Sequence, residues 1–231
     1  TGAALAANFG VVGLGTDTGG SIRVPSAFNS LVGIRPTIGL ASRDGIVPLA
    51  LTQDVGGPMA RTVEDAAIVL DVISGYDPSD VATARSVGEI PASYTSFLDK
   101  DGLQGARIGV VRALFGENEE VVSVVDTAVE DMKKMGATVI DVEIPNLDEI
   151  LSYPSLSTWE FKFQLNEYLE SLGDRAPYRS LNEILASGEY DPSIESSLKE
   201  RNQRESLDAE EYKDILLYRT KLTQDSLLKV M

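Results

Sequence analysis

The residues whose types and spacing could do chemistry gather in one short stretch, residues 13–25. Ser21 follows the pair Gly19-Gly20 there, and glycines at this density are typical of backbone that other residues resist or that a ligand must approach closely. From Thr18 to Ser21 the chain offers four consecutive backbone N–H groups, which suit a negative charge developing on a carbonyl oxygen. Ser21 is therefore a candidate nucleophile, and Thr18, Gly19, Gly20 and Ser21 are candidate oxyanion donors. The alternative is a tight structural turn between a strand and a helix.

A nucleophilic serine needs a base, and the composition limits which base it can have. The chain contains no histidine and no cysteine, which excludes a Ser-His-Asp triad, a thiol nucleophile, disulfides and zinc-thiolate sites within it. Lysine is the best-known substitute for histidine in this role. The eight lysines begin at Lys100, in polar or helical contexts, and none is an obvious partner of Ser21.

Charged side chains flank the candidate nucleophile. Asp17 and Arg23 lie on either side of the glycine pair, and we expect them to brace the loop through an ion pair. Arg35, Asp54 and Arg61 could join such a network. Solvated loop charges are the favoured interpretation for these three.

Other motifs that compete for the same residues fit less well. A dinucleotide-binding fingerprint that starts at Gly13 would need its third glycine where Thr18 stands, and no Gly-Lys-Ser/Thr follows for a phosphate loop. The hydrolase pattern G-x-S-x-G fails because Arg23 occupies the last glycine position. Asp17-Thr-Gly19 has the form of an aspartic-protease signature, but the second carboxylate would have to come from another copy of the chain.

Composition and charge set the broad class. Acidic residues outnumber basic ones by 36 to 20, which gives a formal net charge of −16 and disfavours nucleic acid and anionic membranes as partners. No apolar run reaches the length of a membrane span, and we predict a cytoplasmic protein. The sequence begins in mid-pattern and its last helix has no stop signal. We therefore expect a piece of a longer protein.

The elements that must position Ser21 alternate between strands and helices. An apolar strand over 11–15 precedes the glycine loop and a short helix over 21–30, while 37–58 is expected to be ordered loop with short strands. Thr62-Val-Glu-Asp65 has the form of a capping box, and helical spacing follows to Ile73.

The remaining periodicity predicts a strand, a helix and a second strand, then helices alone. The strands cover 107–112 and 138–144, and Val121, Val124, Val125, Ala128, Met132 and Met135 share one helix face between them. From about residue 149 the pattern becomes helical, over 158–172, 180–188, 192–205 and 208–231. We predict an α/β core over 1–150 and a mainly helical, pocket-shaping segment over 151–231.

The stretch Gly13-Leu-Gly-Thr-Asp-Thr-Gly-Gly-Ser-Ile-Arg-Val-Pro25 resembles the central motif of the amidase signature family. The likeness continues through Leu31-Val-Gly-Ile-Arg-Pro-Thr-Ile-Gly-Leu40, Ser42-Arg-Asp-Gly-Ile-Val-Pro48 and Asp54-Val-Gly-Gly-Pro-Met-Ala-Arg-Thr-Val-Glu-Asp65. Glu160-Phe-Lys, with Leu165-Asn-Glu-Tyr168, looks more like the peptide-amidase branch.

The resemblance implies amide hydrolysis by a Ser–Ser–Lys triad on an α/β/α sandwich with a mixed sheet, with no metal or cofactor. Ser21 matches the acylated nucleophile, residues 18–21 match the oxyanion hole, and Asp17 and Arg23 match loop-supporting positions. The substrate would be a small-molecule or peptide amide.

The family's bridging serine and lysine lie upstream of Thr1-Gly2, so this chain alone is expected to be inactive or nearly so. The alternatives are a non-catalytic scaffold that retains the fold and the ammonia-generating component of an amidotransferase.

Overall fold

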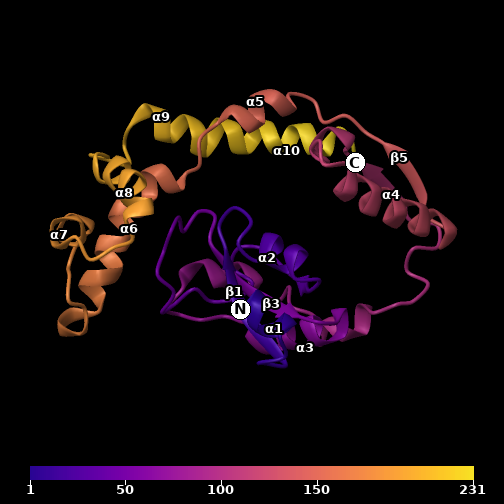
Figure 1. The fold of residues 1–231 in the computed structure, drawn as a ribbon, viewed down its shortest axis with the longest axis horizontal. Coiled ribbons are helices and arrows are strands. Elements are labelled where there is room, and N and C mark those ends of the chain that lie inside the picture. The colour runs from indigo at the N-terminus through magenta and orange to yellow at the C-terminus, as the bar shows by residue number, and fades with distance from the viewer. The chain divides into compact units, whose positions relative to one another are not determined.

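The computed structural model describes residues 1–231, which pack as two compact units. The first unit comprises residues 1–97 and 155–207, and the second comprises residues 98–154 and 208–231. The predicted boundary near residue 150 differs from this division, because most of the helical segment packs with the first 97 residues and its last part packs with 98–154. The course of the chain can be followed by colour in Figure 1.

The first unit combines a small sheet with short helices. Its first part contains α1 (Gly2–Ala6), β1 (Val12–Asp17), α2 (Arg23–Phe28), β2 (Val32–Gly33), β3 (Val55–Ala60), α3 (Val63–Ile73), η1 (Val81–Ser86) and η2 (Tyr94–Phe97). Its second part contains α6 (Ser157–Ser171), η4 (Gly173–Arg175), α7 (Leu181–Ser187), η5 (Pro192–Ile194) and α8 (Glu195–Asn202).

The sheet of the first unit holds β3 between β1 and β2, and both pairings are antiparallel. β3 lies in a region expected to be mainly loop, because Gly56, Gly57 and Pro58 all have low strand propensity. β1 begins at Val12 and extends to Asp17, two residues beyond the predicted strand. Its apolar side chains are not buried as expected, since Leu14 remains 56% exposed.

Packing around β1 fixes the start of the loop that carries Ser21. Leu5, Ile22 and Met59 form a buried cluster against which Leu31 packs. A Cβ at Gly15 would lie 3.0 Å from both Ile22 Cγ1 and Met59 Sδ, so the glycine allows these side chains to pack closely on the strand. Ile22 is fully buried, and it therefore anchors the residue after Ser21 against the sheet.

The predicted caps and helices of the first unit are largely confirmed. The Thr62 hydroxyl accepts a hydrogen bond from the Asp65 N–H at 3.0 Å and caps α3. The helices α6, α7 and α8 pack around Leu165, Leu181 and Leu198 (Figure 1), and their bounds lie within three residues of those predicted.

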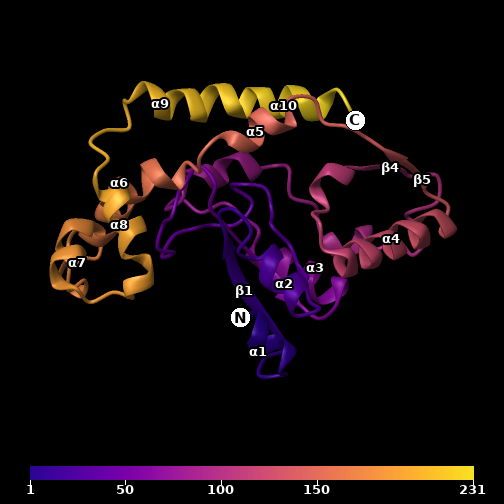
Figure 2. The same cartoon turned by 45° about the horizontal axis from the view of Figure 1, so that its top comes forward.

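The second unit contains the predicted strand–helix–strand motif. It comprises β4 (Arg107–Val110), η3 (Arg112–Leu114), α4 (Glu119–Lys134), β5 (Thr138–Asp141), α5 (Leu147–Ser152), α9 (Glu210–Lys213), the π-helical turn η6 (Asp214–Arg219) and α10 (Thr220–Leu228). β4 and β5 pair in parallel. Figure 2 shows that α9, η6 and α10 run as one continuous helix.

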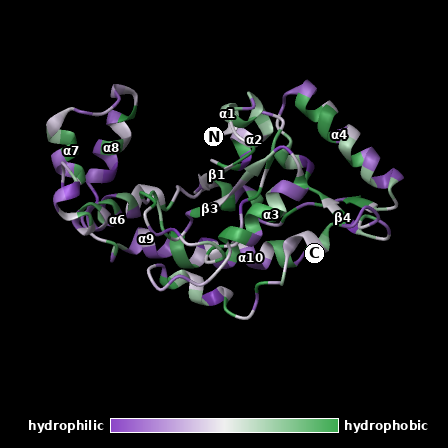
Figure 3. Cartoon of the chain, turned by 90° about the horizontal axis from the view of Figure 1, so that it is seen from below, coloured by the Kyte–Doolittle hydropathy of each residue, from purple (hydrophilic) through white to green (hydrophobic).

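The predicted apolar face of α4 is only partly correct. Val129 is its one buried residue, whereas Val121 and Val124 are 51% and 69% exposed. Hydrophobic and hydrophilic residues are interleaved along this helix in Figure 3. The inward side follows Val122, Val125, Val129 and Met132, of which Val125 and Met132 were on the predicted face. Two adjacent pairs of valines, 121–122 and 124–125, left the choice of face open in the sequence.

The predicted fold class, α/β, is confirmed, with the antiparallel and parallel strand pairs in separate small sheets. No helix in the chain combines the length and apolar character that a bilayer crossing requires. Cytoplasmic location stays a prediction.

Candidate functional site

Ser21 lies between the end of β1 and the start of α2, and its exposed side chain lines a pocket of about 630 Å³ in the first unit. Apolar side chains of Leu14, Ile46, Met59 and Ile73 form much of the wall. The other polar side chains in the lining are hydroxyls, those of Thr1, Thr16 and Ser42. Ser21 is therefore an accessible hydroxyl in a largely apolar pocket without a charged side chain.

The Asp17 carboxylate organises the loop around Ser21. It is fully buried and accepts hydrogen bonds from the N–H groups of Gly20 at 2.7 Å and Ile22 at 3.1 Å. Arg23 adds a fork, with Nε 3.1 Å from Oδ2 and Nη2 3.2 Å from Oδ1. The ion pair expected between Asp17 and Arg23 is thus present.

These bonds keep Asp17 ionised. Burial acts to raise the pKa of the Asp17 carboxyl, but the hydrogen bonds from Arg23 and from the loop N–H groups together lower its pKa to about 2. The carboxylate in turn raises the pKa of the Arg23 guanidinium. At neutral pH the Asp17 side chain is therefore a negatively charged acceptor that holds the N–H groups of Gly20 and Ile22 in place.

Arg35 joins the same network, contrary to the expectation of a solvated loop charge. Its Nη1 donates to the Asp17 carbonyl oxygen and lies 3.3 Å from Asp17 Oδ1, while its Nη2 donates to the Gln53 carbonyl oxygen at 2.7 Å. Its planar fork therefore joins the end of β1 to the segment that leads into β3.

Asp54 was also expected to be solvated, and it is 6% exposed. One of its oxygens accepts a hydrogen bond from the Thr18 hydroxyl, and the other accepts from the N–H groups of Leu49 and Ala50 at 2.8 and 2.9 Å. Arg61 binds elsewhere, to the carbonyl oxygens of Leu5 and Gly10. The contact between Asp54 and Thr18 could not be predicted from sequence spacing, because the two residues are 36 positions apart. The mixture of acidic and basic residues in one glycine-rich region was nevertheless a signal for a buried network.

The four candidate oxyanion donors are not equivalent. The Gly20 N–H already donates to Asp17, so this predicted donor is engaged within the loop. The N–H groups of Thr18, Gly19 and Ser21 have no acceptor in the chain. Gly20 has φ +150°, a conformation that favours glycine, whereas a Cβ at Gly19 would meet no atom within 4 Å.

No lysine of the first unit serves Ser21. Lys162 Nζ donates to the carbonyl oxygens of Asn202 and Arg204 at 2.9 and 2.8 Å, and Lys199 pairs with Glu195 at 2.6 Å. Neither lysine lines the pocket.

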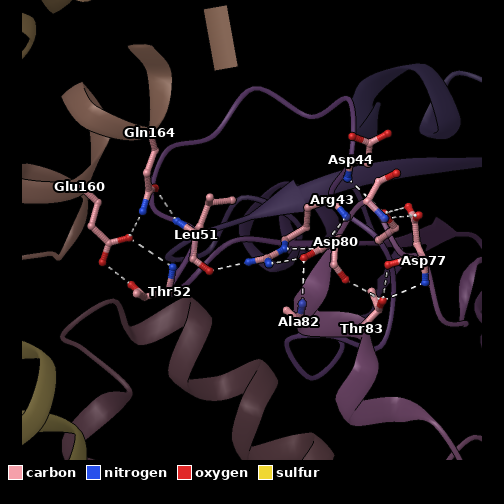
Figure 4. A network of polar contacts seen from close by, with 12 residues as sticks. Arg43, Asp44, Leu51, Thr52, Asp77, Asp80, Ala82, Thr83, Glu160 and Gln164 are labelled. Carbon is pink, nitrogen blue, oxygen red and sulfur yellow. Dashed lines mark hydrogen bonds and ion pairs between the residues drawn. The ribbon is translucent and has the colours of Figure 1, made fainter. Parts of the chain in front are cut away.

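A second polar network holds the loop over residues 42–54 in place (Figure 4). Arg43 makes a bidentate ion pair with Asp80, in which Nη2 lies 2.7 Å from Oδ1 and Nε lies 2.8 Å from Oδ2. Its Nη1 also donates to the Leu51 carbonyl oxygen. On the other side of the loop, Gln164 of α6 accepts from the Leu51 N–H at 2.8 Å, and the fully buried Glu160 accepts from Thr52. The loop is thereby attached both to η1 and to α6.

Comparisons with known proteins agree on one family. The family model described as Amidase matches residues 1–230. A probable amidase of Arabidopsis thaliana is 40% identical over 213 residues, which cover 89% of this chain and 40% of that protein. A glutamyl-tRNA(Gln) amidotransferase subunit of Gloeothece citriformis is 49% identical over 145 residues, which cover 62% of this chain and 29% of that protein.

Solved structures give the same answer. The native peptide amidase from Stenotrophomonas maltophilia superposes with a TM-score of 0.81 at 37% identity, over 92% of this chain and 45% of that one. The chain thus spans less than half the length of these relatives. Because the family model covers all but the last residue, the chain belongs to the amidase family, as the motif around Ser21 predicted.

Proposed function

We propose that this chain carries the nucleophile and oxyanion hole of a serine amidase. Ser21 Oγ attacks the carbonyl carbon of a carboxamide, and the N–H groups of Thr18, Gly19 and Ser21 bind the oxyanion that forms. The C–N bond then breaks, and the nitrogen leaves as ammonia or an amine with the proton that the Ser21 hydroxyl gave up. Water hydrolyses the acyl-serine, which releases the carboxylic acid and restores the Ser21 hydroxyl. Asp17 and Arg23 support the loop.

The observation that carries the proposal is the position of Ser21. Its hydroxyl is exposed to a pocket, next to three backbone N–H groups without acceptors, in the motif that gives the chain its family. A purely structural turn would not need an open pocket at the serine or unoccupied donors beside it. Removal of one oxyanion donor typically costs about two to three powers of ten in rate.

The general base that would activate Ser21 is proposed to lie outside residues 1–231. The family resemblance implies a bridging serine and a lysine upstream of Thr1. Thr1 and Gly2 line the same pocket as Ser21, which supports the arrival of that segment at the nucleophile. A small-molecule or peptide amide is the proposed substrate, since a structural relative that aligns with most of the chain is a peptide amidase.

Labelling with a fluorophosphonate tests the nucleophile in the full-length protein that contains these residues. Mass spectrometry should find the phosphonyl group on Ser21, and Ser21→Ala should abolish both labelling and amide turnover. Turnover that persists in Ser21→Ala would contradict the assignment. A full-length protein that neither labels nor hydrolyses amides would favour the scaffold alternative.

A second candidate is the ammonia-generating component of a tRNA-dependent amidotransferase, favoured by the 49% identity to one such protein. That alignment covers 62% of the chain, against 89% for the Arabidopsis amidase. The solved structure of the corresponding Thermotoga maritima protein also superposes with a lower TM-score, 0.66. Co-purification with the other components of an amidotransferase would support this candidate over a free-standing amidase.

A further inference from the structure

The peptide group between Asp17 and Thr18 is restrained on both sides, at the Asp17 carbonyl oxygen and at the Thr18 side chain. Its carbonyl oxygen accepts a hydrogen bond from Arg35 Nη1. A trans peptide is planar, and its C=O and N–H groups point in opposite directions. No cis peptide occurs in the chain, so the bond from Arg35 also fixes the direction of the Thr18 N–H, away from the guanidinium.

The Thr18 side chain supplies the second restraint. Its hydroxyl donates to Asp54 Oδ1. This hydrogen bond fixes the Thr18 rotamer and restrains the Thr18 backbone, including its N–H group. Asp54 cannot easily move, because its other oxygen accepts from two N–H groups and the residue is 6% exposed. A hydrogen bond to a charged acceptor in a buried site is stronger than a neutral one.

Both restraints depend on residues 51–54. Arg35 is itself held by the Gln53 carbonyl oxygen at 2.7 Å, and Asp54 is the next residue along the chain. The two residues before them, Leu51 and Thr52, are bound to Gln164 and Glu160 of α6 (Figure 4). Residues 51–54 therefore connect the helical part of the first unit to the nucleophile loop.

We propose that Asp54 and Arg35 are positioning residues that orient the Asp17–Thr18 peptide, so that the Thr18 N–H is preorganised for the oxyanion. This inference rests on the proposed amidase function. Neither side chain lines the Ser21 pocket, and both act through the Asp17–Thr18 peptide. Their loss should weaken binding of the transition state more than binding of the ground-state amide.

The test uses the full-length protein and an N-acylated amino-acid amide as substrate. Thr18→Val removes the hydroxyl and keeps the shape, and it should lower kcat by about tenfold to a hundredfold while KM changes by less than about threefold. Thr18→Ser should recover most of the lost rate, because it restores the donor. Arg35→Lys, which replaces the fork by a point charge, should also lower kcat more than it raises KM.

Asp71→Asn is the matched control. Asp71 likewise accepts from a hydroxyl and a backbone N–H, those of Ser93 and Tyr94, both at 2.6 Å, but it lines no part of the Ser21 pocket. This variant should leave kcat and KM unchanged. Any loss of stability is measured separately, by thermal unfolding of each variant.

The double variant Thr18→Val/Asp54→Asn adds a test of coupling. Its kcat should be no lower than that of the slower of the two single variants, because both substitutions act on the same hydrogen bond, the one from the Thr18 hydroxyl to Asp54. Wild-type kcat in Thr18→Val, an equal loss in Thr18→Val and Thr18→Ser, or full additivity would overturn the inference. Amide turnover that survives in Ser21→Ala would overturn the proposed function instead, whatever Thr18→Val does.

Discussion

At the scale of single residues, the loop around Ser21 depends on one buried carboxylate. Asp17 accepts from the backbone of the loop that carries Ser21 and from two arginines, so its charge orients the N–H groups of Gly20 and Ile22. An unpaired buried carboxylate would be costly, but both oxygens of Asp17 accept from several donors. The stability of the loop is therefore tied to the ionisation of this group.

Asp17→Asn should destabilise the chain at pH 7 by about 2 kcal/mol or more, since the arginines and loop N–H groups lose a charged acceptor. The pKa of Asp17 falls from 3.8 to about 2 in the folded state. The carboxylate thus contributes fully above about pH 4, and its contribution is lost as the pH falls towards 2.

Urea unfolding of wild type and Asp17→Asn between about pH 7 and about pH 2.5 checks this prediction. The difference in unfolding free energy between the two proteins should shrink as the pH is lowered through this window. A constant difference across the range would show that the charge of Asp17 does not stabilise the fold.

The glycine pair next to Ser21 offers a comparison at neighbouring positions. Gly20 has φ +150°, and a Cβ there would lie 3.1 Å from Val24 Cγ2. Gly20→Ala should cost about 1–3 kcal/mol through backbone strain, whereas Gly19→Ala, which meets open space, should stay within about 0.5 kcal/mol of wild type. Thermal unfolding of the two variants compares them, and equal losses would contradict the conformational argument.

At the scale of elements, sequence patterns located most helices and the strand before Ser21. They worked where local chemistry decides the structure, as at Thr62, whose hydroxyl caps α3. They expected short strands within 37–58 but did not place β3, where Gly56, Gly57 and Pro58 disfavour a strand locally and the pairing with β1 overrides that preference. The contacts of Arg35 and Asp54 were missed for a related reason, since they depend on how the chain folds back between distant residues.

The attachment of α6 to the loop over residues 42–54 yields a prediction for Glu160. This fully buried carboxylate accepts from the Thr52 N–H at 3.2 Å and from Gln164 Nε2 at 2.8 Å. Glu160→Ala should cost about 2–4 kcal/mol, because it removes the charged acceptor of these hydrogen bonds and leaves a cavity where a fully buried side chain stood. Hydrogen exchange should become faster at the amides of Leu51 and Thr52.

Glu170 provides the control on the same helix. Its side chain is exposed, and Glu170→Ala should change the unfolding free energy by less than about 0.5 kcal/mol. Unchanged exchange at Thr52 in Glu160→Ala would mean that α6 does not hold the loop.

At the scale of the whole molecule, the first unit carries the proposed nucleophile, and no charged side chain lines the pocket at Ser21. The chain contains no histidine, and the pocket at Ser21 is lined by hydroxyls and apolar groups. Of the two lysines of the first unit, Lys162 donates to backbone carbonyl oxygens and Lys199 pairs with Glu195. A serine hydroxyl without a base is a weak nucleophile at neutral pH.

Residues 1–231 alone should therefore react with a fluorophosphonate far more slowly than the full-length protein. General-base assistance typically contributes about two to four powers of ten, so the second-order rate constant at Ser21 should differ by at least about a hundredfold. Ser21→Ala in both proteins measures background labelling, and the fluorescence of Trp159 during urea unfolding shows whether the isolated chain is folded. Equal rates in the two folded proteins would require a base among these 231 residues, and the proposal that the base lies upstream of Thr1 would then be wrong.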